Sequence, residues 1–395
     1  MRLVLLLALG TFALGLDAYV TAGLLSAMAD DLGTSVSATG QTVTAFTLAY
    51  ALVSPLCATL LSAARQRTGL LVSLAVFALA NAGSALAPSF AALLVTRAVA
   101  GVGAGLYLAL AASCATTLVS AERRGRALAM IMGGMSSGTV LGVPVGVLLA
   151  RHAGWRATLC LVAVLGVLSL AGLAVRLPRL LGDTASSPSL RDRLAVLADG
   201  RVASVVTVSF LAAVGSLGLY TYLAPVMESR EMGGVHGITP YLWAWGVGGV
   251  LGSVLIGPLV DRFRRPYALV VGVMAVLCCA LAAFRVTASV TPLLALLPLA
   301  VWGAAGWALQ VPQQHELTTA RGTGGGTVAV ALNESALYLG SAVGSGLGGL
   351  AFGLGWDASV LPLCAAGFAL LGLLTQLTWV RTATRRARPT LAAQD

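Results

Sequence analysis

Long apolar blocks separated by short polar stretches dominate the chain. Leu70 to Ala87 and Ala358 to Val380 are examples, and each is long enough for the ~20 residues that cross a hydrocarbon core. A backbone that faces lipid must satisfy its own hydrogen bonds, so these blocks predict helices. The pattern predicts twelve membrane spans, at residues 3–27, 40–63, 70–87, 90–118, 127–150, 156–175, 202–226, 239–260, 267–284, 291–313, 324–353 and 358–380.

The longest polar stretch, Arg176 to Arg201, divides these spans into two sets of six. Within it, Leu190 to Ala198 could form a short amphipathic helix at the membrane surface. We therefore expect a six-helix bundle over residues 1–177, a cytoplasmic linker over 178–201, a second six-helix bundle over 202–381 and a cytoplasmic tail over 382–395. Paired six-helix halves are found in many transporter folds, and the expected fold is an all-α membrane protein of two pseudo-symmetric bundles.

Charge supports this division. The 24 basic residues are all arginines, and the net charge is +10. With the N-terminus placed inside, 19 arginines fall on the inner side, four on the outer side and one, Arg97, within a span. Because basic residues concentrate on the cytoplasmic side, both termini are predicted to be cytoplasmic. The arginines sit in short clusters between apolar blocks, so nucleic acid is not an expected partner.

Composition narrows the class further. The chain is 58% hydrophobic and 10% charged, whereas a soluble domain carries roughly 25% charged residues. The six cysteines lie in predicted helices without a C-x-x-C pair, and the three histidines are far apart, so we expect neither disulfides nor a metal site. The N-terminal apolar run could mimic a secretory signal, but Asp17 lies inside it and the run continues, which favours a retained first helix.

The fifth span contains a ladder of glycines. Gly134, Gly138, Gly142 and Gly146 recur every four residues, with Pro144 between the last two. This spacing places all four glycines on nearly one helix face, where another helix backbone can approach closely. Tight packing is expected there whatever the function of the protein.

Several of these motifs resemble those of the major facilitator superfamily. The stretch Gly142 to Gly146 resembles the fifth-helix motif of its antiporters. The stretch Arg97 to Gly105, with Gly101, Gly103 and Gly105, looks like the fourth-helix R-x-x-x-G-x-G motif. The segment from Gly257 to Arg265, with Asp261 and Arg262, is similar to the G-x-L-x-D-R-x-G-R-R loop signature, and Gly154-Trp155-Arg156 matches drug exporters. The first-half copy of the loop signature is degraded, with Ser62, Ala63 and Ala64 in place of its glycine and acid.

The resemblance covers essentially the whole chain. It implies a bacterial inner-membrane protein of the twelve-helix drug:proton antiporter branch, of the multidrug or antibiotic efflux type. It also implies that the Asp261–Arg262 loop locks one conformational state through ion pairs. Such motifs identify the fold better than the cargo.

Two charged residues stand out in the first half. Arg97 is ~10 Å into its helix counted from Phe90, and an arginine at a helix centre costs ~3 kcal/mol on insertion scales, so it is expected to face a cavity or a partner. The alternative is that it snorkels near the outer helix end. Asp17 lies ~21 Å along the first span and resembles the acidic first-helix position of the family. It could alternatively be a structural acid paired with a hydroxyl or with Arg97.

Glu334 is ~15 Å past the glycines that begin the eleventh span. The resemblance does not imply an acid here, and the expectation rests on residue chemistry. Burial favours the neutral form of a carboxyl group, so Glu334 could exchange protons or pair with a cationic substrate. The alternative is a protonated glutamic acid hydrogen-bonded to a neighbouring helix. The predicted proton-coupling residues are therefore Asp17, Arg97 and Glu334.

Softer candidates for the substrate site are polar or aromatic residues inside predicted spans. Aromatic residues in membrane proteins more often form interface belts or core, and this reading stays open for each of them. The candidates, besides Glu334, are Tyr19, Thr21, Tyr220, Tyr222, Gln310, Asn333 and Tyr338; Trp302, Trp307, Gln313 and Gln314 also lie in the tenth span or at its end.

Together these features predict a proton-coupled secondary exporter of small amphiphilic molecules, such as antibiotics, that works by alternating access. No G-x-x-x-x-G-K-[ST] motif occurs, so the proton gradient rather than a nucleotide is the expected drive, with no cofactor. The expected partners are the small-molecule substrate, protons and the lipid bilayer, and a monomer suffices. A sugar or metabolite transporter of the same fold is the alternative. A channel is disfavoured by the paired halves, and an enzyme by the lack of a catalytic constellation.

Overall fold

The computed structural model describes residues 2–60, 66–178, 195–235, 237–262, 266–320 and 322–391, and within these ranges the regular structure is entirely helical. The first half contains α1 (Arg2–Val20), α2 (Leu25–Asp31), α3 (Val36–Leu60), α4 (Gln66–Ala85), α5 (Phe90–Thr117), α6 (Arg124–Ser137), α7 (Val143–Ala153) and α8 (Trp155–Arg176). The second half contains α10 (Gly200–Thr221), α11 (Leu223–Glu228), α12 (Thr239–Arg262), α13 (Pro266–Val290), α14 (Leu296–Ala308), α15 (Gln310–Ala320), α16 (Gly322–Gly353) and α17 (Leu361–Leu391).

Eleven helical segments in the described part of the chain are long and apolar enough to cross a membrane. The 25-residue helix α3 lies between the first two of them and takes the place of the second predicted span. Large apolar side chains point outward, such as Leu79 at 71% exposure and Leu297 at 71%. Outward apolar side chains suit a surface that faces lipid. The predicted all-α membrane fold is therefore confirmed.

Some span boundaries differ from the predicted ones. The first apolar segment ends at Gly23 rather than at residue 27, because the helix breaks at the 3-10 turn η1 (Thr21–Gly23). The segment that matches the tenth predicted span continues to Thr318 rather than ending at residue 313. Of the predicted amphipathic helix Leu190–Ala198, residues 190–194 lie outside the described residues, and Val196–Ala198 form a 3-10 turn. The division into bundles, linker and tail stays a prediction.

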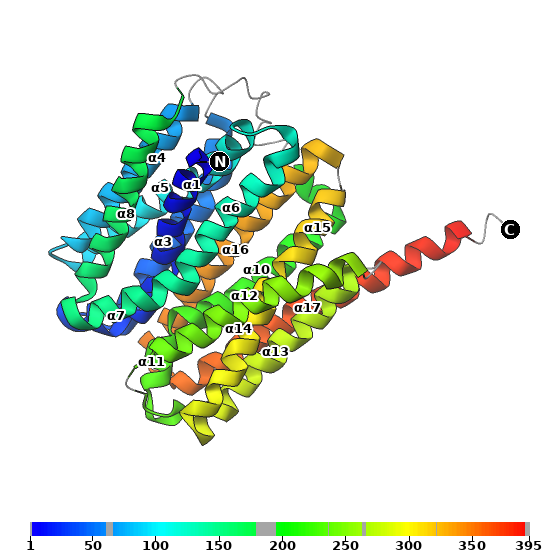
Figure 1. Ribbon diagram of the computed structural model, residues 1–395. Helices are drawn as coiled ribbons and strands as arrows, with labels where there is room; N and C mark the ends of the chain where they lie inside the picture. The colour runs from blue at the N-terminus through cyan, green and yellow to red at the C-terminus, as the bar shows by residue number, and fades with distance from the viewer. Residues whose placement is uncertain are drawn as a thin grey trace.

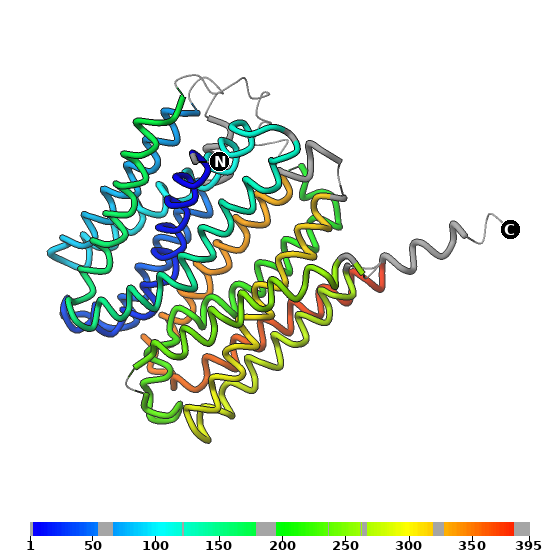
Figure 2. Tube along the Cα trace, viewed as in Figure 1, coloured from blue at the N-terminus to red at the C-terminus, as the bar shows by residue number. Residues whose placement is uncertain are grey.

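Figure 1 shows two groups of helices, the first in blue to green and the second in green to red, with α16 alongside the first group. The path of the chain in Figure 2 follows the same two groups. We call the end of the bundle at which α1 begins the near end, and the opposite end the far end. The halves meet chiefly where α3 packs on α16, with smaller contacts of α7 on α12 and of η1 on α10.

Several hydrogen bonds join the halves in the described part of the chain: one between the side chains of Tyr50 and Tyr338, and three closer to the far end. Ser26 Oγ donates to Glu228 Oε2 at 2.9 Å, beside the far ends of both halves. On the α3–α16 contact, Ser37 Oγ donates to the Gly349 carbonyl at 2.6 Å, and the Thr44 and Ser345 hydroxyls lie 2.8 Å apart. All three lie between the far end and the middle of the helices. The far end is therefore closed by direct contact of the two halves.

The glycine ladder of the fifth span packs against α1. A Cβ atom on Gly138 would collide with the backbone of Phe12, and one on Gly15 of α1 would collide with that of Met135. The expected close approach of helix backbones is thus present, with α1 as the partner. The ladder includes a π-helical turn, Gly138–Gly142, which ends two residues before Pro144. A wider turn accommodates a proline, which cannot donate a backbone hydrogen bond.

In the part of the chain that the structure describes, three membrane helices are interrupted by a turn. α1 ends at Val20 before η1, α10 ends before Tyr222, and α14 ends before Leu309, where α15 takes over. Discontinuous helices are common around transporter binding sites because they free backbone groups and bend the helix. The interruptions at the first helix of each half lie at corresponding positions.

Candidate substrate and proton site

Glu334 lies near the middle of α16, where the two halves meet. Its side chain is half-buried, and its carboxylate is hydrogen-bonded to the side chain of Gln314 on α15. Tyr19 of α1 and Tyr50 of α3 interact electrostatically with this carboxylate, as does Tyr338 one turn along α16. The carboxylate is thus enclosed by side chains from both halves, while the residue as a whole keeps some accessible surface.

Aromatic rings from both halves cluster beside this carboxylate. Across the halves, Tyr50 and Tyr338 stack with their ring centroids 3.7 Å apart. Tyr19 meets Tyr220 edge-on at 5.6 Å and Trp245 at 5.9 Å. Within the second half, the Trp245 ring lies 4.4 Å from Tyr220 and 5.9 Å from Trp307. We call Tyr19, Tyr50, Tyr220, Trp245, Trp307 and Tyr338 the aromatic cluster.

The second intramembrane acid, Asp17, lies in a buried ion pair. Arg97 Nη1 donates to Asp17 Oδ1 at 2.7 Å and to Asn81 Oδ1 at 3.1 Å, and Asn81 Nδ2 donates to Asp17 Oδ2 at 3.0 Å. The three side chains are at most 1% exposed. The guanidinium also lies over the Phe46 ring, 4.6 Å from its centroid. Both carboxylate oxygens accept N–H donors, as suits the ionised form.

The fourth-helix motif positions both parts of the site. A Cβ atom on Gly101 would collide with the backbone of Phe46, and one on Gly105 would lie 2.9 Å from the Tyr50 carbonyl oxygen. These glycines therefore let α3 lie directly on α5. That contact brings the Phe46 ring to Arg97 and holds Tyr50 at the interface with α16.

The two acids lie in different surroundings, although Asp17 and Tyr19 are only two residues apart on α1. A separation of two residues turns the side chains to nearly opposite faces of a helix. Asp17 points into the first half, toward α4 and α5, and Tyr19 points to the second half. Asp17 and Glu334 share no hydrogen-bond partner in the described part of the chain.

The remaining substrate-site candidates are placed unequally. Tyr222 is fully buried outside the aromatic cluster, where its hydroxyl donates to the Ser345 carbonyl at 2.9 Å. Thr21 and Asn333 are buried, and Gln310 is half-buried one helical turn before Gln314. Glu334, Tyr19, Tyr220 and Tyr338 are therefore the candidates that the structure brings together.

The loop signature of the second half lies at the near end of α12. Gly257 has open space around its Cα, and Arg262 is exposed. The side chain of Asp261, residues 263–265 and the degraded copy at residues 62–64 fall outside the described residues. The predicted lock at Asp261 and Arg262 stays a prediction.

Sequence reasoning missed three residues of this region. Asn81 carried a usable signal, because an amide inside an apolar span needs a partner. Tyr50 and Trp245 carried none that distinguished them from core or interface aromatics, because their role depends on which helices face each other. In the described part of the chain no group of three or more His, Cys, Asp or Glu could hold a metal ion.

An exposed ion pair, Asp31 with Arg156, connects α2 to α8 at the far end of the first half. Arg156 is hydrogen-bonded to Asp31, and Trp155 Nε1 donates to the same carboxylate oxygen at 3.1 Å. The hydrogen bond from Arg156 is the main reason that the pKa of Asp31 is lowered from its usual value. Arg156 also donates to the Ala87 carbonyl at 3.2 Å, so the Gly154-Trp155-Arg156 motif joins three segments.

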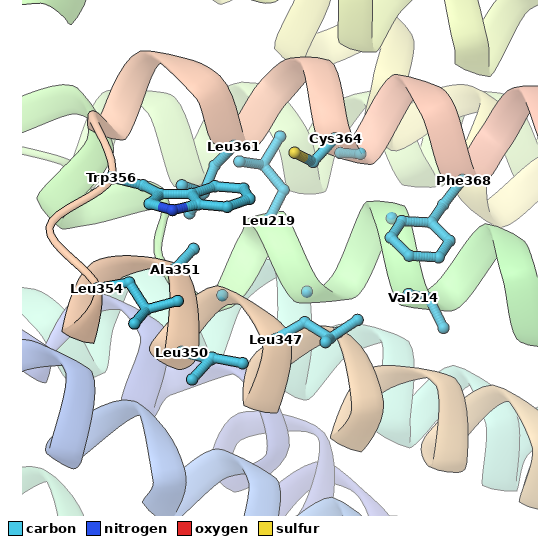
Figure 3. Close-up of a pocket in the computed structure, with 15 residues that line it drawn as sticks. Val214, Leu219, Leu347, Leu350, Ala351, Leu354, Trp356, Leu361, Cys364 and Phe368 are labelled. Atoms are coloured by element: carbon cyan, nitrogen blue, oxygen red, sulfur yellow. The ribbon is translucent and has the colours of Figure 1, made fainter.

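A separate crevice of about 290 Å³ opens between α10, α16 and α17. Its lining is apolar, including Leu219, Leu347 and Phe368, with Trp356 at one end (Figure 3). Gly218 and Gly344 allow the close helix crossing at its floor, since a Cβ atom on Gly218 would lie 2.7 Å from Gly344 Cα. The crevice has no ionisable side chain except Cys364, so it offers no place for proton exchange.

Two six-helix groups that enclose a carboxylate and an aromatic cluster at their interface define a membrane transporter. Comparison with known proteins agrees: the family model of the Major Facilitator Superfamily matches residues 7–345. The chain therefore belongs to the Major Facilitator Superfamily, and it is a multi-pass membrane protein.

Relatives and solved structures are consistent with this membership. The chain is 30% identical to the inner membrane transport protein YdhP of Escherichia coli K12, over 94% of both chains. It is 35% identical to a chloramphenicol resistance protein of Streptomyces lividans, over 65% of this chain and 66% of that protein. The xylose transporter XylE of E. coli, in a partially occluded inward-open conformation, has a TM-score of 0.68 at 19% identity, covering 96% of this chain and 97% of XylE. That likeness concerns the fold alone.

Proposed function

We propose that this protein is a proton-coupled exporter of small amphiphilic molecules in a bacterial inner membrane. The observation that carries the proposal is Glu334, whose carboxylate lies between the two halves, bordered by Gln314 and the aromatic cluster. A carboxyl group there can take up or release a proton as the halves rearrange. Four of the six rings are at most 3% exposed in this structure, and they would offer apolar surface to an amphiphile when the halves move apart.

The proposed direction of transport, export, is argued from the membrane topology and from similarity to known proteins. Arginines concentrate at the near end, which by the positive-inside rule would be cytoplasmic together with both termini. The contacts that close the far end would then separate the site from the outside. Similarity to a chloramphenicol resistance protein and to an inner membrane transport protein supports export of a drug-like molecule.

The two acids take different roles in this proposal. Glu334 exchanges protons and meets the cargo. Asp17, already neutralised by Arg97 and held by Asn81, stabilises the arrangement of α1, α4 and α5, and the Asp17–Arg97 pair changes as α1 moves. The loop at Asp261 and Arg262 would stabilise one of the alternating states.

The test is transport driven by a pH gradient in proteoliposomes. Across a panel of antibiotics and cationic dyes that includes chloramphenicol, wild type should move at least one compound uphill when the gradient is imposed and should stop when it is collapsed. Glu334→Gln should abolish the response to the gradient, whereas Asp17→Asn and Arg97→Ala should lower the amount of folded protein as well as its rate. Saturable transport that ignores the proton gradient, or a Glu334→Gln variant that couples like wild type, would refute the proposal.

A further inference from the structure

We propose that the cargo of this site is a monovalent organic cation, whose charge pairs with Glu334 while the aromatic cluster covers its apolar groups. This inference rests on the proposed function and adds the charge of the substrate to it. It also states that proton and cargo occupy the same carboxylate in turn.

The first argument is the absence of a counter-charge. Asp17 is matched by Arg97 at 2.7 Å, whereas the side chain bonded to Glu334 is the neutral amide of Gln314. In the described part of the chain no arginine contributes to the surroundings of Glu334, and its close ionisable neighbours are tyrosines. An ionised carboxylate in this place is a costly unpaired charge, which either a proton or a cation can neutralise.

The second argument is the kind of surface around the carboxylate. Faces of aromatic rings attract cations, and they do so most strongly away from water. The Tyr50–Tyr338 stack and the Tyr19, Tyr220 and Trp245 rings provide such faces in the membrane interior. A neutral amphiphile would gain only apolar contact there, and an anion would be repelled by Glu334.

The third argument concerns coupling. Tyr19 and Tyr50 belong to the first half, and Tyr220, Trp245 and Tyr338 to the second. A cation bound between them is held by both halves at once. The exchange balances in charge: a protonated Glu334 gives up one proton to the solvent as one monovalent cation pairs with the carboxylate, and the reverse step releases the cation.

Binding to purified protein in detergent tests the inference. Tetraphenylphosphonium is a permanent cation, and triphenylphosphine oxide is a neutral probe of related shape. We expect wild type to bind the cation at least about tenfold more tightly than the neutral probe. Binding of the cation should weaken as the pH is lowered, and in weakly buffered solution it should release protons. Glu334→Gln should lose both the preference and the proton release.

Matched variants separate a binding role from a folding defect. Glu316→Gln makes the same change at a buried glutamate of α15 whose charged neighbour is Arg201, and it should keep the cation preference and the proton release. Tyr338→Phe retains the ring face and should bind the cation like wild type, whereas Tyr338→Leu should weaken binding several-fold without affecting the neutral probe. This pair still tests the inference if Glu334→Gln fails to fold.

The outcomes distinguish the two proposals. If wild type drives chloramphenicol with a proton gradient but binds both probes equally, or binds the cation without releasing protons, the cation inference is wrong and the proposed function stands. If the cation binds with proton release but no substrate is moved by a gradient, the proposed function fails and the site assignment survives. Retention of the cation preference in Glu334→Gln would also overturn the inference.

Discussion

The buried pair of Asp17 and Arg97 makes a quantitative prediction about stability. Both side chains are at most 1% exposed, and Asn81 is hydrogen-bonded to each of them. Removal of one partner of a buried ion pair leaves an uncompensated charge and costs about 3–5 kcal/mol. Removal of both partners leaves no such charge and is often nearly neutral.

We therefore expect Asp17→Asn and Arg97→Met each to lower the free energy of unfolding by about 3 kcal/mol or more, and the double variant to lose much less than the sum. The coupling energy of this double-mutant cycle should be about 3 kcal/mol in favour of the pair. Unfolding in mixed micelles of increasing dodecyl sulfate content, followed by circular dichroism, measures each free energy.

The exposed pair of Asp31 and Arg156 is the control for this cycle. Its side chains are 44% and 39% exposed, so water competes with the interaction and screens it. Asp31→Asn and Arg156→Met should show a much smaller coupling than the buried pair. Equal couplings for the two pairs, or additive losses for Asp17→Asn and Arg97→Met, would refute the view that Asp17 is an ionised partner of Arg97.

Two further predictions concern the far end. The hydroxyls of Thr44 and Ser345 lie 2.8 Å apart, and α3 and α16 must separate there during alternating access. On a background without the native cysteines, a disulfide between Thr44→Cys and Ser345→Cys should therefore stop transport until a reductant is added. Continued transport by the cross-linked protein would show that this contact stays closed. The lowered pKa of Asp31 means that its ionised form stabilises the fold above about pH 4, and that this contribution is lost as the pH falls through the lowered pKa. The thermal unfolding temperatures of wild type and Asp31→Asn should therefore differ at neutral pH and converge in acid. Parallel plots of unfolding temperature against pH for the two proteins would contradict the assignment.

Most of the fold was accessible from the sequence, because a membrane leaves few choices to an apolar helix. The predicted spans match the helices to within a few residues in most cases. The misplaced ends of the first and tenth spans have one cause: hydropathy does not register a break at Thr21 or a helix that continues through Gln313 to Thr318. The glycine ladder predicted a close backbone approach, but it could not name α1 as the partner.

The site was harder to predict from the sequence than the fold. Glu334 and Arg97 were found because a charge inside a span must be explained. Whether Asp17 belongs with Arg97 or with Glu334 depends on the rotation of α1, and rotation is set by packing. Tyr50 looked like any aromatic residue of a span, and only its stack on Tyr338 from the other half reveals its place. Tyr222 shows the converse, since a promising neighbour of Tyr220 is buried against Ser345.

The opposite orientations of Asp17 and Tyr19 on α1 have a mechanical consequence. One rigid helix touches the ion pair of the first half with one face and the aromatic cluster with the other. A twist of α1 about its own axis would therefore loosen or tighten both contacts together. Communication between the two places then needs no relay of side chains. Rotation of α1 as one rigid body against the glycine ladder would be enough.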